Sequence, residues 1–318
     1  MDNVRIMTRT TIIGAYDQGT FGALERLPHD IALRPGAPVE CFWRIVAKRS
    51  ILAAGALERP VAFANNDRPG IMMVRAYLNR WGVAPGRSVA VFGNTDDAHR
   101  TAADLVAAGV HVSALIDARH HATSTLDVPF YPGAQVCDAA GRKGLEAISI
   151  SGHGGVDRVQ ADCLAMSGGW NPTVHLSCHM NGRPVWNHDI AGFVPVDGAV
   201  PGMVFAGACR GDFSTRACLE GGVAAAGEVV RDLGLEVAPP KIPMAEDGEY
   251  DIAPLWAVPG KGRAWLDFQN DVTVKDVTQA AAENFRSVEH MKRYTTQGMA
   301  TDQGKNSNVG ALAVLADA

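Results

Sequence analysis

The sequence predicts an α/β protein built from Rossmann-like units, and three observations support that class. Residues 88–117 read as a buried strand, a helix and a second strand, which is the repeating unit of a doubly wound parallel sheet. The apolar strand expected at 50–54 ends in two alanines followed by Gly55, and the one expected at 203–208 ends in Ala206-Gly207-Ala208. Small residues are needed at such places when the backbone passes close to a ligand. A helix expected over 214–232 follows the second of these strands.

Composition bounds the class of protein further. The chain has 318 residues, enough for two or three compact units, and its 20% charged and 47% hydrophobic residues are ordinary for a soluble globular protein. The formal net charge of −5, without a basic block, argues against nucleic acid and anionic membranes as partners. No apolar run reaches the roughly 18 residues of a membrane span, so we expect a cytoplasmic protein. The six cysteines form no C-x-x-C pair, which predicts reduced thiols and no metal site.

The remaining elements are expected in chain order. Before the strand at 50–54 we expect turns at 17–19 and 35–36 and strands at 4–7, 9–16, 21–27 and 41–46. In the middle of the chain we expect a helix at 72–81 and then strand 88–93, helix 97–108 ended by Gly109, and strands 110–117, 147–151 and 161–166. Beyond the proline-rich stretch 237–243 we expect helices at 274–284 and 287–295 and a turn at 302–305.

The stretch Ile51–Pro60 carries the most informative motif. Its residues Ala53-Ala54-Gly55-Ala56-Leu57-Glu58-Arg59-Pro60 resemble the A-(T/A)-G-A-x-x-R-P pattern of flavoproteins that have two dinucleotide-binding domains. In those proteins the pattern marks where the chain leaves the cofactor domain. The G-x-G-x-x-G turn that usually precedes it is absent from this sequence. We therefore expect a piece of a larger protein that begins after the first βαβ unit.

A second nucleotide-type turn follows the strand at 88–93. In Gly93-Asn94-Thr95-Asp96-Asp97-Ala98, Thr95 replaces the second glycine of the dinucleotide fingerprint. Asp96 and Asp97 suit the start of a helix but would repel a phosphate placed there. Asp117 stands where a ribose-binding acid would lie. A cofactor at this turn and a Rossmann-like unit that has lost its nucleotide both remain open, and the charges favour the second.

The small residues after the strand at 203–208 affect the choice of cofactor. Related flavoproteins have A-x-G-D at this place, where the aspartate binds the ribityl chain of FAD, whereas here Ala208 replaces it. This favours NAD or another adenine nucleotide over FAD, while a vacant domain remains an alternative.

Other candidate features favour structural roles. Ser167-Gly168-Gly169-Trp170-Asn171-Pro172 reads as a tight turn with an anchoring tryptophan, although such a turn could line a ligand cavity. His175, His179 and His188 have no standard metal spacing. No Ser-His-Asp or Cys-His arrangement can be defended from the sequence.

The C-terminal segment resembles the small helical [2Fe–2S] domain of amine and opine dehydrogenases. In that domain C-x-C is followed at a distance by C-Q-G-x-x-x-C, and on this match the four ligand positions fall at Asp267, Gln269, Asp302 and Ser307. None is a cysteine, and iron–sulfur clusters need thiolate ligands. We infer a domain that kept its fold and lost its cluster.

Together these stretches resemble the α subunit of heterotetrameric sarcosine oxidase over nearly the whole chain. The most specific parts are Gly55–Pro60 with Asn66–Gly70, Gly168–Pro172, and Val288–Thr296 with Asp302–Lys305. The resemblance implies a flavoprotein-type fold of two dinucleotide-binding domains followed by a small helical domain. The domains would be 1–66 (part of the first), 67–165 (inserted second Rossmann-like domain), 166–236 (return to the first), 237–260 (linker) and 261–318 (A3-type domain).

The resemblance also implies cofactors, partners and a reaction. NAD would bind this subunit, while a β subunit would hold FAD and covalently attached FMN, and γ and δ subunits would complete the complex. A folate-binding domain similar to the glycine-cleavage T protein would follow Ala318 and is absent here. The complete enzyme would demethylate sarcosine to glycine with O2, pass the one-carbon unit to tetrahydrofolate and release H2O2. The flavin carries the redox chemistry, and we expect no catalytic residue in this chain.

Nucleotide contacts are carried over to Ala208, Phe213 and Thr215. Thr11, at the end of an early strand, is a further candidate for packing on adenine, and Gly55 is expected where the backbone approaches the cofactor.

Three other functions stay open. The first is the α subunit of a related opine or proline dehydrogenase or of hydrogen cyanide synthase, against which the missing cysteines count. The second is an NAD(P)H:disulfide or ferredoxin reductase, which would need a redox C-x-x-C or a complete FAD fingerprint. The third is a structural subunit with a vacant nucleotide fold.

Overall fold

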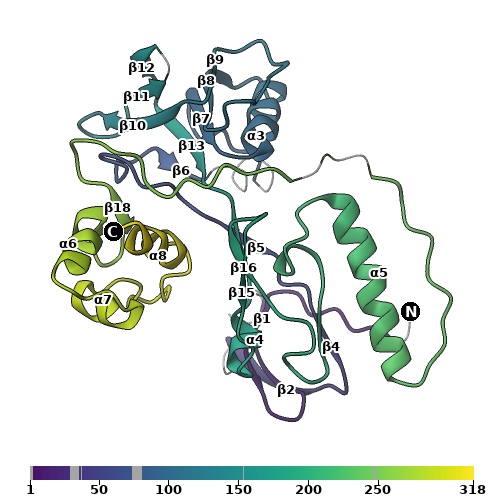
Figure 1. Ribbon diagram of the computed structural model, residues 1–318. Helices are drawn as coiled ribbons and strands as arrows, with labels where there is room; N and C mark the ends of the chain where they lie inside the picture. The colour runs from purple at the N-terminus through teal and green to yellow at the C-terminus, as the bar shows by residue number, and fades with distance from the viewer. Residues whose placement is uncertain are drawn as a thin grey trace. The chain divides into compact units, whose positions relative to one another are not determined.

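The computed structural model describes residues 3–28, 36, 38–73, 81–152, 154–245, 248 and 250–318 (Figure 1). It divides into two compact units, each formed by separate stretches of chain. The first unit comprises residues 1–56, 172–187 and 192–249, and the second comprises residues 57–171, 188–191 and 250–318.

The first unit begins with an antiparallel meander of β1 (Thr10–Tyr16), β2 (Thr20–Arg26) and β3 (Glu40–Val46). The turn between β1 and β2 places Gln18 and Gly19 at φ of 59° and 67°, as the sequence predicts. The strand expected at 4–7 is wrong: these residues lie outside any strand, and without a pairing partner Ile6 is left 84% exposed. Of the turn expected at 35–36, Pro35 lies outside the described residues.

The second sheet of this unit is a parallel pair. β4 (Ser50–Leu52) pairs with β17 (Met203–Phe205), with Leu52 opposite Phe205. Both strands are shorter than predicted, because β4 ends before Ala53 and the chain after β17 turns into the 3₁₀ segment η1 (Gly207–Cys209). Helix α5 (Thr215–Asp232) follows.

Helix α5 starts where the sequence predicts. The Ser214 Oγ accepts a hydrogen bond from the Ala217 amide at 3.1 Å, which is a standard N-cap. The unit also contains α4 (His175–His179) and the hairpin of β15 (Val185–Asn187) and β16 (Gly192–Val194). Its core consists of Ala15, Leu52, Val200, Met203, Phe205 and Cys209.

The second unit contains the predicted doubly wound sheet. Its parallel strands have the order β6 (Ile71–Met72), β13 (Cys163–Ser167), β7 (Ser88–Gly93), β8 (His111–Asp117) and β9 (Phe130–Pro132). Helix α3 (Asp96–Ala107) joins β7 to β8, as Figure 1 shows.

Local signals explain why α3 was predictable. Thr95 caps its N-terminus, and Gly109 follows its C-terminus with φ of 76°. The helix expected at 72–81 falls largely on residues 74–80, which lie outside the described residues, and Met72 belongs to β6.

An antiparallel sheet covers part of the parallel one. It consists of β10 (Gln135–Ala140), β11 (Ala147–Gly152) and β12 (Gly155–Gln160), of which only the middle strand was predicted. Apolar side chains of both sheets share one core, which includes Ala90, Phe92, Ile116, Val136, Ile148 and Ile150.

The C-terminal part of this unit is a small helical domain. After the hairpin of β18 (Trp265–Asp267) and β19 (Val272–Thr273) come α6 (Val274–Ala282), α7 (Val288–Thr295) and α8 (Asn308–Asp317). The helices pack around a core that includes Val277, Met291, Ala311 and Val314. The sequence predicted α6 and α7 but not α8. The chain passes from the first unit into the second within β5 (Ala56–Glu58). It returns to the first unit at the end of β14 (Trp170–Pro172).

Among the residues that the structure describes, none of the helices combines the length and the apolar character that crossing a lipid bilayer requires.

Candidate functional site

The first candidate site is the carboxyl edge of the β4–β17 pair in the first unit. Because the two strands are parallel neighbours, the segments that follow them leave the sheet at the same edge. Gly55 follows β4 with φ of 72°, and Gly207 follows β17 with φ of 69°. A Cβ added at Gly55 would meet no heavy atom within 4 Å. The space beside the Gly55 main chain is therefore open, whereas a Cβ at Gly207 would lie 3.8 Å from Cys218 Sγ.

Helix α5 begins at Thr215, a few residues after η1 in the chain. Four N–H groups at the beginning of a helix lack partners within the helix, and together with the helix dipole they favour an anionic group. Ser214 satisfies one of them, the amide of Ala217. In the segment between η1 and α5, the amides of Arg210 and Asp212 donate to the Gly207 carbonyl at 2.8 and 3.4 Å, so these two donors are used within the turn itself.

Four of the five predicted contact residues belong to this edge. Ala208 lies within η1, Phe213 lies between η1 and α5, Thr215 is the first residue of α5, and Gly55 follows β4. Thr11 is exposed on β1 and pairs with Leu24 in the meander instead.

The structure adds an acidic group that the sequence analysis did not single out. Asp212 lies between η1 and the cap of α5, and burial raises the pKa of its carboxyl above the ordinary value. A carboxylate at the edge of a nucleotide-type sheet can accept hydrogen bonds from a ribose diol. Its residue type and position just before a helix were the only signals in the sequence.

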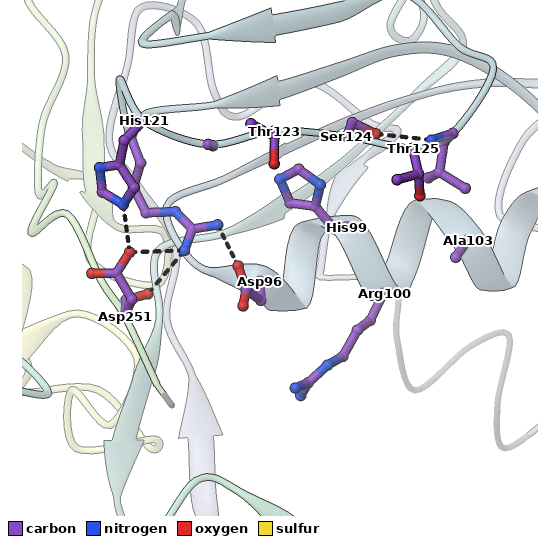
Figure 2. A pocket seen from close by; sticks show the side chains of 12 residues that line it. Asp96, His99, Arg100, Ala103, His121, Thr123, Ser124, Thr125 and Asp251 are labelled. Atoms are coloured by element: carbon purple, nitrogen blue, oxygen red, sulfur yellow. Dashed lines mark hydrogen bonds and ion pairs between the residues drawn. The ribbon is translucent and has the colours of Figure 1, made fainter. Parts of the chain in front are cut away.

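The second candidate site is the carboxyl edge of β7 and β8 in the second unit (Figure 2). A pocket of about 610 Å³ is lined by the first turns of α3 and by the loop after β8. The figure shows His99 and Thr123 facing each other across it and His121 beside Asp251. The remaining lining residues include Asp96, Arg100, Arg119, Ser124 and Thr125.

Arg119 is the centre of this second site. Its buried guanidinium contacts the carboxylates of Asp117 at 2.8 Å, Asp96 at 2.6 Å and Asp251 at 3.1 Å. Burial lowers the pKa of Arg119, but the hydrogen bonds that its guanidinium donates to Asp117 and Asp96 outweigh this effect and raise the pKa overall. The sequence could not indicate this network, because Arg119 and Asp251 are 132 residues apart.

Asp117, the expected ribose-binding acid, is already engaged. Its side chain is fully buried, and its carboxylate accepts hydrogen bonds from His99 Nε2 at 2.8 Å and from the main chain and side chain of Arg119. Burial raises the pKa of this carboxyl, but these hydrogen bonds hold it below the ordinary value. Asp117 therefore acts as an internal anchor for Arg119 and His99 in this structure.

The third candidate site is the place where the resemblance to a [2Fe–2S] domain puts the four ligand positions. Asp267, Gln269, Asp302 and Ser307 all line one cavity of about 210 Å³. The carboxylate of Asp267 accepts three main-chain hydrogen bonds, from Gln269 at 2.9 Å, Asn270 at 3.2 Å and Gly298 at 2.8 Å. The Nε2 of Gln297 donates to Ser307 Oγ at 2.7 Å. Hydrogen bonds of the protein thus connect the segments that carry these positions.

The turn at 167–172 has a structural role. Arg59, 2% exposed, donates from Nε to the Gly168 carbonyl at 2.6 Å and from Nη1 to Asn171 Oδ1 at 3.0 Å and the Ala191 carbonyl at 2.7 Å. Its guanidinium also lies 4.5 Å from the ring centre of Trp256. Burial lowers the pKa of Arg59 to about 10, so it stays charged at neutral pH.

The histidines near this turn form no metal centre. His175 and His179 belong to α4, and His179 Nδ1 accepts a weak hydrogen bond from the Ala15 amide at 3.4 Å. Within the described part of the chain, no group of three or more His, Cys, Asp or Glu side chains is arranged to hold a metal ion.

The fold and these edges define a class, the FAD/NAD(P)-binding flavoprotein fold. The structure resembles that of the L-proline dehydrogenase from P. horikoshii, with a TM-score of 0.69 and 20% identity, over 96% of this chain and 58% of that one. It also resembles T. acidophilum thioredoxin reductase, with a TM-score of 0.52 and 16% identity, over 70% of this chain and 74% of that one. The predicted fold class is confirmed.

Sequence relatives narrow the class to one kind of subunit. The chain is 44% identical over 328 residues to sarcosine oxidase subunit alpha of Rhizobium meliloti (strain 1021), a match that covers 100% of this chain and 33% of that protein. It is 37% identical over 340 residues to the same subunit of Corynebacterium sp. (strain P-1), covering 98% and 35%. Residues 261–318 match the sarcosine oxidase A3 domain. The chain is thus a homologue of sarcosine oxidase α subunits, as the motifs indicated, and spans about a third of their length.

Proposed function

We propose that this chain is the cofactor-binding part of the α subunit of a multisubunit, flavin-dependent sarcosine oxidase and that its first unit holds NAD. The observation that carries the proposal is the edge of β4 and β17, where Gly55 has positive φ and open space and α5 begins nearby. A dinucleotide fits such an edge because its pyrophosphate needs close main-chain approach and the amides of a helix start.

The residues at this edge agree better with NAD than with FAD. Ala208 provides no carboxylate for a ribityl chain, whereas NAD has no ribityl chain and needs none. Gly55 and Gly207 would face the pyrophosphate, Phe213 and Thr215 would contact the adenosine half, and Asp212 would accept from a ribose hydroxyl. Thr11 remains a candidate for the adenine. When bound, NAD supplies a nicotinamide that can accept or release a hydride.

The rest of the enzyme is proposed from the relatives. Sarcosine, tetrahydrofolate and O2 would give glycine, methylenetetrahydrofolate and H2O2, with FAD and FMN on a β subunit and with γ and δ subunits completing a cytoplasmic heterotetramer. The relatives' name and the 44% identity support this assignment. The fold is shared with an L-proline dehydrogenase, so proline is the alternative substrate. Oxidation of sarcosine and oxidation of proline by the complete enzyme should therefore be compared in one assay.

The experiment uses the full-length protein in its native complex. Native mass spectrometry measures bound NAD in the wild type, in Gly55→Ala and in Gly198→Ala. The control is closely matched: Gly198 has φ of 76°, and a Cβ there also meets no atom within 4 Å, so backbone strain is the same in both variants. We expect the amount of bound NAD to be at least tenfold lower in Gly55→Ala than in Gly198→Ala. Equal NAD content in the two variants would refute the site, and a wild type without nucleotide would refute NAD binding altogether.

A further inference from the structure

The second unit has the layout of a nucleotide crevice, but its own chain lies across it. In a doubly wound sheet, ligands bind outside the carboxyl ends of the strands, next to the turn that follows the first strand of the βαβ unit. Here that turn is Asn94–Thr95 after β7. Residues 250–253, which we call the strap, contact this turn.

Main-chain and side-chain hydrogen bonds fix the strap to the turn. The Ala253 amide donates to the Asn94 carbonyl at 3.1 Å, and the Asn94 Nδ2 donates back to the Ala253 carbonyl at 2.8 Å. The same Nδ2 also donates to the Gly168 carbonyl at 3.2 Å. The strap therefore lies against the turn that a pyrophosphate would approach and takes up one of its donors, the Asn94 Nδ2.

The carboxylate of Asp251 fixes the strap to the end of β8. It accepts from Arg119 Nη1 at 3.1 Å. It also accepts from His121 Nε2 at 2.9 Å, and Figure 2 shows these two side chains next to each other. The Arg119 side chain is only 4% exposed and is held in place by Asp117. Asp251 is thus paired with Arg119, the cationic side chain that an acidic group of a ligand would need as its partner.

Side-chain packing closes the other flank of the crevice. A Cβ built on Gly169 would lie 2.8 Å from Ile252 Cδ1 and 3.3 Å from the Tyr250 hydroxyl. These two strap residues are therefore in tight contact with the main chain after β13. The strap is held at three places: the turn after β7, Arg119 after β8, and Gly169 after β13.

We propose that the strap is a built-in plug of this crevice, so that the native protein binds no dinucleotide in its second Rossmann-like unit. Ala253 takes the place of a pyrophosphate at the turn, and Asp251 takes the place of a ligand's acidic group on Arg119 and His121. Asp96, which also contacts Arg119, adds a negative charge that disfavours phosphate. The second unit then serves as a scaffold, which leaves the edge of β4 and β17 as the place for NAD.

Hydrogen exchange with mass spectrometry tests the plug in the full-length protein, with NAD and NADPH as the probes. In the wild type we expect neither probe to change the exchange of residues 93–98 or 117–122 by more than twofold. Slower exchange at 93–98 together with faster exchange at 250–256 would mean that a dinucleotide displaces the strap, and would overturn the proposal. Exchange at 52–56 and 205–216 reports on the first unit separately, so the NAD site there can fail without affecting this result.

Opening the strap tests the cause of exclusion. The variant Asp251→Ala/Ile252→Ala should raise strap exchange at least tenfold, whereas Asp157→Ala, at an exposed position of β12, should not. To remove the remaining charge, Asp96→Asn is compared with the triple variant Asp96→Asn/Asp251→Ala/Ile252→Ala. We expect NADPH to protect residues 93–98 only in the triple variant. Equal protection in both variants, or in neither, would refute the strap as the element that excludes the ligand. If the triple variant does not fold, Asp251→Ala and Asp96→Asn/Asp251→Ala provide the same comparison.

Discussion

The substitution Asp267→Asn in the C-terminal domain should open the segment around Gly298. The carboxylate of Asp267 is 2% exposed; its Oδ1 accepts from Gln269 and Asn270, and its Oδ2 accepts from Gly298. An asparagine that keeps its oxygen at the Oδ1 position places an NH2 group against the Gly298 amide, so that two donors face each other. Losing one hydrogen bond to a buried charged group costs about 2 kcal/mol.

Local hydrogen exchange measures this loss better than global unfolding, because a chain of several units does not unfold in two states. A local cost of about 2 kcal/mol corresponds to a roughly 30-fold faster exchange. We expect that increase in the peptide containing Gly298 and no change for Asp271→Asn, the same substitution at an exposed neighbour. An increase below about threefold would refute the argument that the Asp267 carboxylate holds these segments together.

Three further predictions concern the other networks. Replacing all four positions of the lost cluster by cysteine should allow a [2Fe–2S] cluster to assemble, seen as thiolate-to-iron absorption and a paramagnetic signal on reduction; a folded variant without either would show that the positions do not converge. Arg59→Leu should speed local hydrogen exchange at residues 168–171 by the equivalent of about 3 kcal/mol or more, because it leaves buried acceptors without donors. Arg59→Lys keeps the charge but not the fork of donors, so it should show a smaller increase that is still clear; a lysine variant that exchanges like the wild type would contradict the importance of the fork geometry. Because the pKa of Asp117 is lowered on folding, its contribution to stability is present above its unfolded pKa of about 4 and is lost as the pH falls through the folded value. Thermal unfolding between pH 7 and pH 3 should therefore be less acid-sensitive in Asp117→Asn than in the wild type.

The parts of the fold that the sequence predicted are those with local signals. Helix α3 has a capping threonine and a terminal glycine, and β7 and β8 are continuous apolar runs. Strands β10 and β12 were missed because their stability comes from pairing with β11 and from packing on the parallel sheet, which no short window reveals. The false strand at 4–7 is the converse case: suitable residues without a partner.

The candidate sites divide in the same way. Gly55 and Ala208 could be placed at one edge from sequence, because the carboxyl ends of parallel strands must lie together. The resemblance to a cluster-binding domain located the four cavity-lining positions. The strap could not be foreseen, since residues 250–253 follow a proline-rich stretch without periodicity and their partners lie far away in the chain.

The hydrogen bonds around Arg59 bear on how such a chain could have arisen. The Arg59 amide donates to the Gly169 carbonyl at 2.9 Å, and the Gly168 amide donates to the Arg59 carbonyl at 2.7 Å. The two ends of the segment between them, residues 60–167, therefore lie next to each other, as the ends of an inserted domain do. A piece with adjacent ends can be gained, exchanged or deleted in one genetic event at little cost in loop closure. Homologues carrying a shorter or different insert at this junction are therefore expected.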